Sequence, residues 1–194
     1  MGIRLDVMTD IETLGTKSDS TIFQISAIAF DIKTGEHYNT FNVVADIEKN
    51  NKLTIDGSTL KWWLNTDKEL LSKLLNSGTG SSDQMIFEFH NWLNCLSDDT
   101  RDVHLWGNGI LFDNKMIEHQ MELLGLKYPI FYRNDRDMRT LMDLACQKVG
   151  MSEKGFKETY GLKNLVAHDA FDDVKWQIDI VVKAYHLLIN AKSM

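Results

Sequence analysis

Several features that restrict a fold or its location are scarce in this 194-residue sequence. It contains one proline, which leaves no proline-rich linker to separate domains. Its two cysteines are too few for a disulfide framework, so we expect buried free thiols and a cytoplasmic protein. No apolar run reaches the length of about 20 residues that a membrane-spanning helix requires, and the N-terminus lacks the apolar core of a signal peptide. We therefore expect no membrane partner.

Positive charge is also scarce. The 21 Lys and Arg residues are outnumbered by 28 Asp and Glu residues, which gives a formal net charge of −7. Proteins that coat nucleic acid electrostatically carry a basic surface, so the composition argues against that class. It does not exclude an enzyme that acts on nucleic acid, because bound cations would neutralise part of an acidic site. Substrate contacts should then be local, at a chain end rather than along a duplex.

The rest of the composition is that of an ordinary globular protein, with 43% hydrophobic and 25% charged residues. We expect a single domain over residues 1–194, because this length suits one core. Apolar runs predict five strands, at residues 3–9, 21–32, 37–45, 103–107 and 129–134. Apolar residues at helical spacing predict five helices, at about residues 58–75, 82–96, 112–125, 137–150 and 169–190. Three strands followed by helices that alternate with two further strands predict an α/β sheet covered on both faces.

Asp10 and Glu12 stand directly after the first predicted strand, in the segment DIETLG. Residues two apart on an extended backbone point to the same side, so both carboxylates can face one ligand. A pair of solvated charges at a strand end is the alternative, because D-x-E is a short and common motif. The apolar strand before the pair favours the metal-binding interpretation.

Asp113 follows a glycine-rich turn in the segment GNGILFDN. Glycines let the backbone approach a ligand closely. Asp113 also opens a predicted helix, where a carboxylate interacts favourably with the helix dipole. Both a ligand role and a capping role are therefore open for this residue.

His168 and Asp173 belong to the segment HDAFDD, which begins the last predicted helix. Asp173 lies between the apolar stripe and the polar side of that helix, so we expect it to be a ligand. Asp172 aligns with the polar side and is expected to be solvated. His168 precedes the helix, where its side chain can enter a site; an exposed loop position is the alternative.

Carboxylates gathered at one point repel each other unless a cation holds them. Hard divalent cations such as Mg²⁺ are held by one or two carboxylates each, together with substrate phosphate oxygens. A nearby histidine can supply the proton transfer that an attacking water requires. Four carboxylates and one histidine in this order favour a metal-dependent nuclease.

The ordered combination resembles the signature of the DEDD 3′→5′ exonucleases of the histidine subtype (DEDDh), which have the ribonuclease H-like fold. The matching residues are Asp10-Ile-Glu12, then Asp113 after an aromatic residue, then His168-Asp-Ala-Phe-Asp-Asp173. Further stretches resemble the branch that includes bacteriophage exonuclease A and exonuclease VIII-type nuclease domains. They are TLKWWL at 59–64, HLWGNG at 104–109 and NDRDMRTLMDL at 134–144.

The resemblance implies a mixed five-stranded sheet, an antiparallel meander followed by parallel strands, with helices on both faces. It also implies two divalent cations, Mg²⁺ or Mn²⁺, that clamp the attacking and leaving oxygens of an in-line displacement. Their ligands would be Asp10, Glu12, Asp113 and Asp173. His168 would accept the proton of the nucleophilic water, and nucleoside 5′-monophosphates would leave from a 3′ end.

Substrate contacts are expected from five residues beside these motifs: Thr13, Leu14, Trp62, Asn108 and Phe112. Trp62 can stack on the terminal base, although packing at a helix–sheet edge is the alternative. Phe112 is most simply a core residue, and Trp106 is expected to pack in the core. Of Arg133, Arg136 and Arg139, one can meet phosphate, whereas a solvated face is the expected place for most of them.

The leading hypothesis is a 3′→5′ exonuclease that acts on the 3′ ends of single-stranded DNA. An exoribonuclease or oligoribonuclease for short or overhanging RNA is the alternative within the same chemistry, because selection of a 2′-hydroxyl depends on pocket geometry. A catalytically idle nucleic-acid-binding module is the alternative from another class, but all five motif positions are filled. A homodimer remains open.

Overall fold

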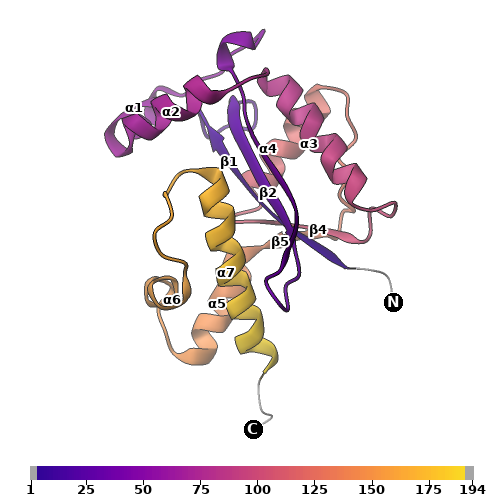
Figure 1. Ribbon diagram of the computed structural model, residues 1–194, viewed down its shortest axis with the longest axis vertical. Helices are drawn as coiled ribbons and strands as arrows, with labels where there is room; N and C mark the ends of the chain where they lie inside the picture. Colours follow the sequence, from indigo (N-terminus) through magenta and orange to yellow (C-terminus); the bar gives the residue numbers. More distant parts are fainter. Residues whose placement is uncertain (1–3, 191–194) are drawn as a thin grey trace.

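A computed structural model describes residues 4–190 of the chain as a five-stranded sheet between layers of helices (Figure 1). The strands are β1 (Leu5–Thr13), β2 (Ile22–Phe30), β3 (His37–Val44), β4 (Val103–Gly107) and β5 (Asp135–Asp137). Their order in the sheet is β3-β2-β1-β4-β5. β1, β2 and β3 pair antiparallel, whereas β1, β4 and β5 pair in parallel. The mixed sheet expected from the sequence is confirmed.

Helices follow the meander and separate the last two strands. They are η1 (Ile47–Lys49), α1 (Gly57–Thr66), α2 (Lys68–Ser77), α3 (Ser82–Leu96), α4 (Asp113–Leu123), α5 (Met138–Val149), α6 (Glu153–Tyr160) and α7 (Ala170–Ile189). α3 and α4 cover one face of the sheet, and α5 and α7 cover the other (Figure 1). Both faces are therefore buried, as expected.

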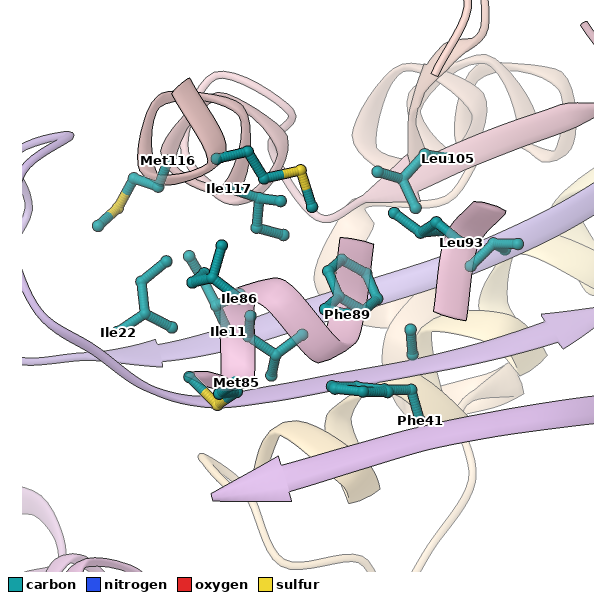
Figure 2. Packing of buried hydrophobic residues seen from close by; sticks show 14 of the residues in the cluster. Ile11, Ile22, Phe41, Met85, Ile86, Phe89, Leu93, Leu105, Met116 and Ile117 are labelled. Carbon is teal, nitrogen blue, oxygen red and sulfur yellow. The ribbon is translucent and has the colours of Figure 1, made fainter. Parts of the chain in front are cut away.

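The central strand β1 contributes side chains to the hydrophobic clusters on both faces of the sheet, because its side chains alternate between the faces. Val7 and Ile11 belong to the hydrophobic cluster under α3 and α4, whereas Met8 belongs to the cluster under α5 and α7. Figure 2 shows Phe89 and Leu93 of α3 pointing toward the strands in the first cluster. Burial of these apolar side chains fixes which way the polar residues of β1 must face.

A third cluster attaches α1 and α2 to the sheet. Trp63 is buried against Phe23, and its indole Nε1 donates a hydrogen bond to the carbonyl of Thr13 at 3.1 Å. Leu14 and the leucines of α2 complete the cluster. This contact fixes α1 beside the carboxyl end of β1.

The predicted strand at 129–134 is wrong. The residues that pair with β4 are Asp135–Asp137, opposite Leu105–Gly107. The Asn134 side chain donates two hydrogen bonds of 2.9 Å, to the carbonyls of Arg101 and Val103, and its own N–H closes a turn. These bonds hold Asn134 at the end of a turn, so the strand begins at Asp135. Three polar residues, rather than the apolar run, therefore enter the sheet.

Two helix predictions also need correction. The helix expected over 58–75 is divided at Asp67, whose φ of −154° and ψ of 82° are not helical. Its side chain accepts a hydrogen bond from the Leu70 N–H at 2.8 Å and so caps α2. The eight-residue helix α6 was not predicted, because only Phe156 in it is buried and no apolar stripe marks it.

Cys146 is buried, as expected, but Cys95 is exposed. On α3 the buried stripe runs through Phe89 and Leu93, and Cys95 lies two positions further along, which turns it to another side of the helix. Both thiols are free. Within residues 4–190, no helix combines the length and apolar character that a membrane span needs.

Candidate active site

Asp10 and Glu12 lie within β1 rather than after it, because the strand continues to Thr13. They pair with Ser26 and Gln24 of β2. Both carboxylates lie on the same face of the strand as Met8, the face that α7 covers. The strand therefore changes from apolar to acidic on this face toward its carboxyl end.

The first turn of α7 brings Asp173 to the same place. One carboxylate oxygen from each of Asp10, Glu12 and Asp173 lies within 4.8 Å of the other two. One turn later along α7, Gln177 is only 1% exposed, and its Nε2 donates a hydrogen bond to Asp10 Oδ1 at 2.7 Å. The other side-chain atom of this amide, Oε1, is buried without a partner.

Asp113 enters the same cavity from α4. It is the first helical residue, it is 4% exposed, and it follows the turn that leaves β4. The last residue of β4, Gly107, passes so close to the helix start that a Cβ on it would lie 2.6 Å from Asn114 Oδ1 and 3.3 Å from Asp113 Oδ2. The glycine therefore permits the approach that brings Asp113 to the site.

His168 lines the cavity from the loop before α7. Its backbone has a φ of +67°, and its N–H donates a hydrogen bond to Asp173 Oδ2 at 3.1 Å. The imidazole packs edge-on against Trp62, with 4.9 Å between ring centroids. The four carboxylates and His168 thus border one cavity of about 530 Å³.

The carboxylates destabilise one another in their charged forms. Burial first, and then the charges of Asp113 and Asp173, raise the pKa of Asp10 well above its ordinary value. Burial and the Asp10 charge do the same to the pKa of Glu12. Burial raises the pKa of Asp113 to about 7. In their charged forms these buried acids therefore destabilise the folded chain, and a bound cation would relieve that destabilisation.

The residues fit a divalent cation. All the clustered donors are carboxylate oxygens, the ligands that Mg²⁺ and Mn²⁺ favour, and the unpartnered Gln177 Oε1 lies next to them. A cation would compensate the charges that raise these pKa values.

Comparison with known protein families agrees with a nuclease site. Residues 5–185 match the model of the 3′-5′ exoribonuclease Rv2179c-like domain. The chain belongs to this family. It is therefore a 3′→5′ exonuclease, a hydrolase. Comparison with curated protein sequences finds no match.

Solved structures share the fold of this Rv2179c-like exonuclease. Cell-death related nuclease 4 (CRN-4) matches with a TM-score of 0.68 and 16% identity, over 98% of this chain and 66% of that one. The nuclease domain of 3′hExo, a DEDDh family member bound to rAMP, matches with 0.60 and 16%, over 99% and 96%. E. coli exonuclease I in complex with a dA16 oligonucleotide matches with 0.66 and 14%, over 96% and 41%. The chain thus spans about two thirds of the CRN-4 chain and two fifths of exonuclease I.

The expected substrate residues divide between two cavities and the core. Trp62, 44% exposed, and Thr13 line a second cavity of about 540 Å³, Asn108 lines the first cavity, and Phe112 lines both. Leu14 is 2% exposed in the cluster of Trp63 and borders neither cavity with its side chain.

Two further expectations concern residues near the motifs. Trp106 packs in the core, as expected, where its Nε1 donates a hydrogen bond to Asp6 Oδ1 at 2.7 Å. Asp172 lies outside the cavity and forms an ion pair of 2.9 Å with Lys175. It also accepts a hydrogen bond of 3.0 Å from the Val166 N–H, so it stabilises the loop that carries His168.

Sequence reasoning missed Gln177 and Asp137 as residues of the site. Gln177 follows Asp173 by one helical turn, and that spacing was a usable signal. Asp137 lines the first cavity and has an unpartnered buried Oδ1. It offered no signal because the strand that carries it, β5, was predicted in the wrong place.

The buried acids predict how stability without metal depends on pH. The folded-state pKa of Asp113 is about 7, above its ordinary value of 3.8, so the folded chain binds this proton more tightly than the unfolded chain does. Stability should therefore fall as pH rises between these values. In EDTA, the melting temperature of Asp113→Asn minus that of wild type should increase from pH 5 to pH 8. A difference that stays constant would contradict the assigned environment of Asp113.

Proposed function

We propose that this protein removes nucleotides one at a time from single-stranded 3′ ends and releases nucleoside 5′-monophosphates. One observation carries the proposal. A cavity bordered by the four carboxylates of the sequence motifs and by His168 adjoins a second cavity lined by Trp62 and Trp63, and Glu12 and Phe112 border both. The first suits a phosphodiester held through cations, and the second suits a terminal nucleoside.

The chemistry assigned to the chain is a hydrolysis. Asp10, Glu12, Asp113 and Asp173 would hold two divalent cations, Mg²⁺ or Mn²⁺, which supply charge stabilisation and an activated water. His168 accepts the proton as water attacks the terminal phosphorus. The bond from phosphorus to the O3′ of the preceding nucleotide breaks, and that O3′ takes a proton from solvent and leaves as a hydroxyl, while His168 returns its proton to solvent. The edge-on contact with Trp62 orients the imidazole of His168.

The terminal base is assigned to the second cavity. Thr13, Ser58 and Thr59 supply polar groups to its wall, and Trp62 and Phe112 supply aromatic surface. Stacking on an aromatic side chain contributes about 1–3 kcal/mol per base and tolerates any base. A sequence-independent exonuclease needs that tolerance.

The proposed substrate is RNA, which differs from the single-stranded DNA expected from the sequence motifs. The family model that matches residues 5–185 is described as an exoribonuclease. DNA is the second candidate, supported by the likeness to exonuclease I in complex with dA16. We give the family match more weight because the likeness to exonuclease I, at 14% identity, is one of fold.

We also propose that this chain belongs to the branch that includes bacteriophage exonuclease A and exonuclease VIII-type nuclease domains. Its three stretches of resemblance lie beside the site: α1 carries Trp62, the turn after β4 carries Asn108, and the start of α5 carries Arg139. We further propose that residues 1–194 act as one exonuclease domain. A single sheet shared by the two large hydrophobic clusters supports this. Two free thiols support a reducing compartment such as the cytoplasm.

Matched oligonucleotides test the choice of sugar. RNA and DNA of one sequence, each labelled at the 5′ end, should both be incubated with the protein and Mg²⁺. RNA is expected to shorten stepwise from the 3′ end with the higher kcat/KM, and the nucleotide released should be a 5′-monophosphate. Faster cleavage of the DNA would contradict the choice of RNA and would favour single-stranded DNA as the substrate. Internal cuts without a ladder would contradict the exonuclease proposal itself.

A further inference from the structure

Arg139 is unusual in the first cavity because it is positively charged. Five carboxylates border that cavity: Asp10, Glu12, Asp113, Asp137 and Asp173. Within the part of the chain that the structure describes, Arg139 is the only Lys or Arg among the lining residues. The protein carries a net charge of −7, so a nucleic-acid strand that enters this cavity meets mostly negative charge and one arginine.

The exposed side chain of Arg139 is held by one hydrogen bond. Its Nε donates a hydrogen bond to Asn108 Oδ1 at 3.1 Å. It also lies over Gly109, whose φ is +117° and whose added Cβ would stand 3.3 Å from Arg139 Cζ. Any larger residue at position 109 would be strained and would press on the guanidinium. The glycine-rich turn thus forms a platform under this side chain.

The two terminal nitrogens of Arg139 remain available. Within residues 4–190, neither Nη1 nor Nη2 has a hydrogen-bond acceptor, and no carboxylate forms an ion pair with this guanidinium. The other two arginines of the run differ. Arg136 donates to the carbonyls of Arg133 and Asp135, and Arg133 lies over the ring of Tyr132. Of these three arginines, Arg139 is the one that lines the cavity and offers free donors to it.

Its location indicates which anion it meets. Glu12 and Phe112 border both cavities, whereas Asn108, Gly109 and Arg139 border the first cavity and not the cavity with Trp62. With the terminal nucleoside beside Trp62 and the scissile phosphate at the carboxylates, the remaining strand leaves past Arg139. The next phosphodiester then meets the fork of Nη donors, which suits two anionic oxygens.

We propose that Arg139, held by Asn108 over Gly109, forms a subsite for the phosphodiester one linkage upstream of the scissile bond. This inference rests on the proposed function, because it uses the orientation of the strand in the site. The subsite would retain the shortened strand after each cleavage, since the phosphate it holds becomes the next scissile group. Its contribution is to binding.

A binding cycle tests the subsite without cleavage. Asp113→Asn protein is titrated in Mg²⁺ with a fluorescent single strand that carries one uncharged methylphosphonate, at the second or at the fifth linkage from the 3′ end. Adding Arg139→Met should weaken binding of the all-phosphate strand about tenfold to hundredfold. The second-linkage methylphosphonate alone should weaken binding by a similar factor. Both changes together should cause no further loss.

Several controls accompany the cycle. Arg133→Met, from the same run but outside the cavity, and the fifth-linkage methylphosphonate should each leave affinity nearly unchanged. Independent losses that multiply when combined would overturn the assignment, as would unchanged affinity in Arg139→Met. The methylphosphonate arm needs no substitution at Arg139, so misfolding of that variant does not decide the result. Failure of the proposed function would appear separately, as wild-type protein that leaves the strand intact.

Discussion

Asp113→Asn is expected to abolish cleavage without loss of the fold. Asparagine keeps the shape of the side chain, but it removes one of the four charges that would hold the cations. Turnover should fall by at least about 10²–10³-fold, the range for removing a single group that stabilises transition-state charge. The measurement is the initial rate on a labelled single strand, with the melting temperature determined in parallel.

Asp143→Asn is the matched control, because Asp143 is exposed on α5 and, within residues 4–190, its side chain hydrogen-bonds only to Gln147. It should keep wild-type turnover. If Asp113→Asn also kept full turnover, the carboxylate would have only its alternative role at the start of α4. An equal or higher melting temperature together with lost activity would separate the site from the scaffold.

Removal of the His168 imidazole is expected to lower turnover by about 10²–10⁴-fold, the range for a general acid or base. Asparagine is the better replacement than alanine here. The backbone at this position has a φ of +67°, a conformation that Asn adopts more readily than Ala. His168→Asn should therefore retain the loop and the N–H contact with Asp173.

The His168 result is measured as kcat at saturating oligonucleotide, with His37→Ala as the control because His37 is exposed on β3. Cation affinity, measured by calorimetry without substrate, should change little in His168→Asn. Unchanged kcat would eliminate the assignment of His168 as proton acceptor. A large loss of cation affinity would instead indicate that this loop mainly positions Asp173.

Much of the site is encoded in local spacing. Asp10 and Glu12 share a strand face, and Asp173 follows His168 by five residues on the segment that enters α7. These relations need only strand and helix periodicity. The sequence therefore predicted the five main residues of the cavity, together with the antiparallel meander that begins the sheet.

Two features that the sequence did not settle depend on contacts between distant segments: which of Arg133, Arg136 and Arg139 borders the cavity, and where the last strand lies. Arg139 reaches the cavity because Asn108, 31 positions earlier, accepts its hydrogen bond. Asp137 enters the sheet because the Asn134 side chain bonds to the segment before β4. Neither interaction leaves a periodic pattern, and a polar three-residue strand does not look like a strand. The apolar residues at 129–134 favoured the wrong register for that reason.

The most direct test of the central claim is metal-dependent, 3′-directed hydrolysis by the wild-type protein. A single strand labelled at its 5′ end should be incubated with the protein in Mg²⁺, in Mn²⁺ and in excess EDTA, and in EDTA followed by excess Mg²⁺. We expect a ladder that shortens from the 3′ end with either cation, no products in EDTA, and restored cleavage after Mg²⁺ is added. Undiminished degradation in EDTA would contradict the account, because the four carboxylates could then not be acting through a bound cation.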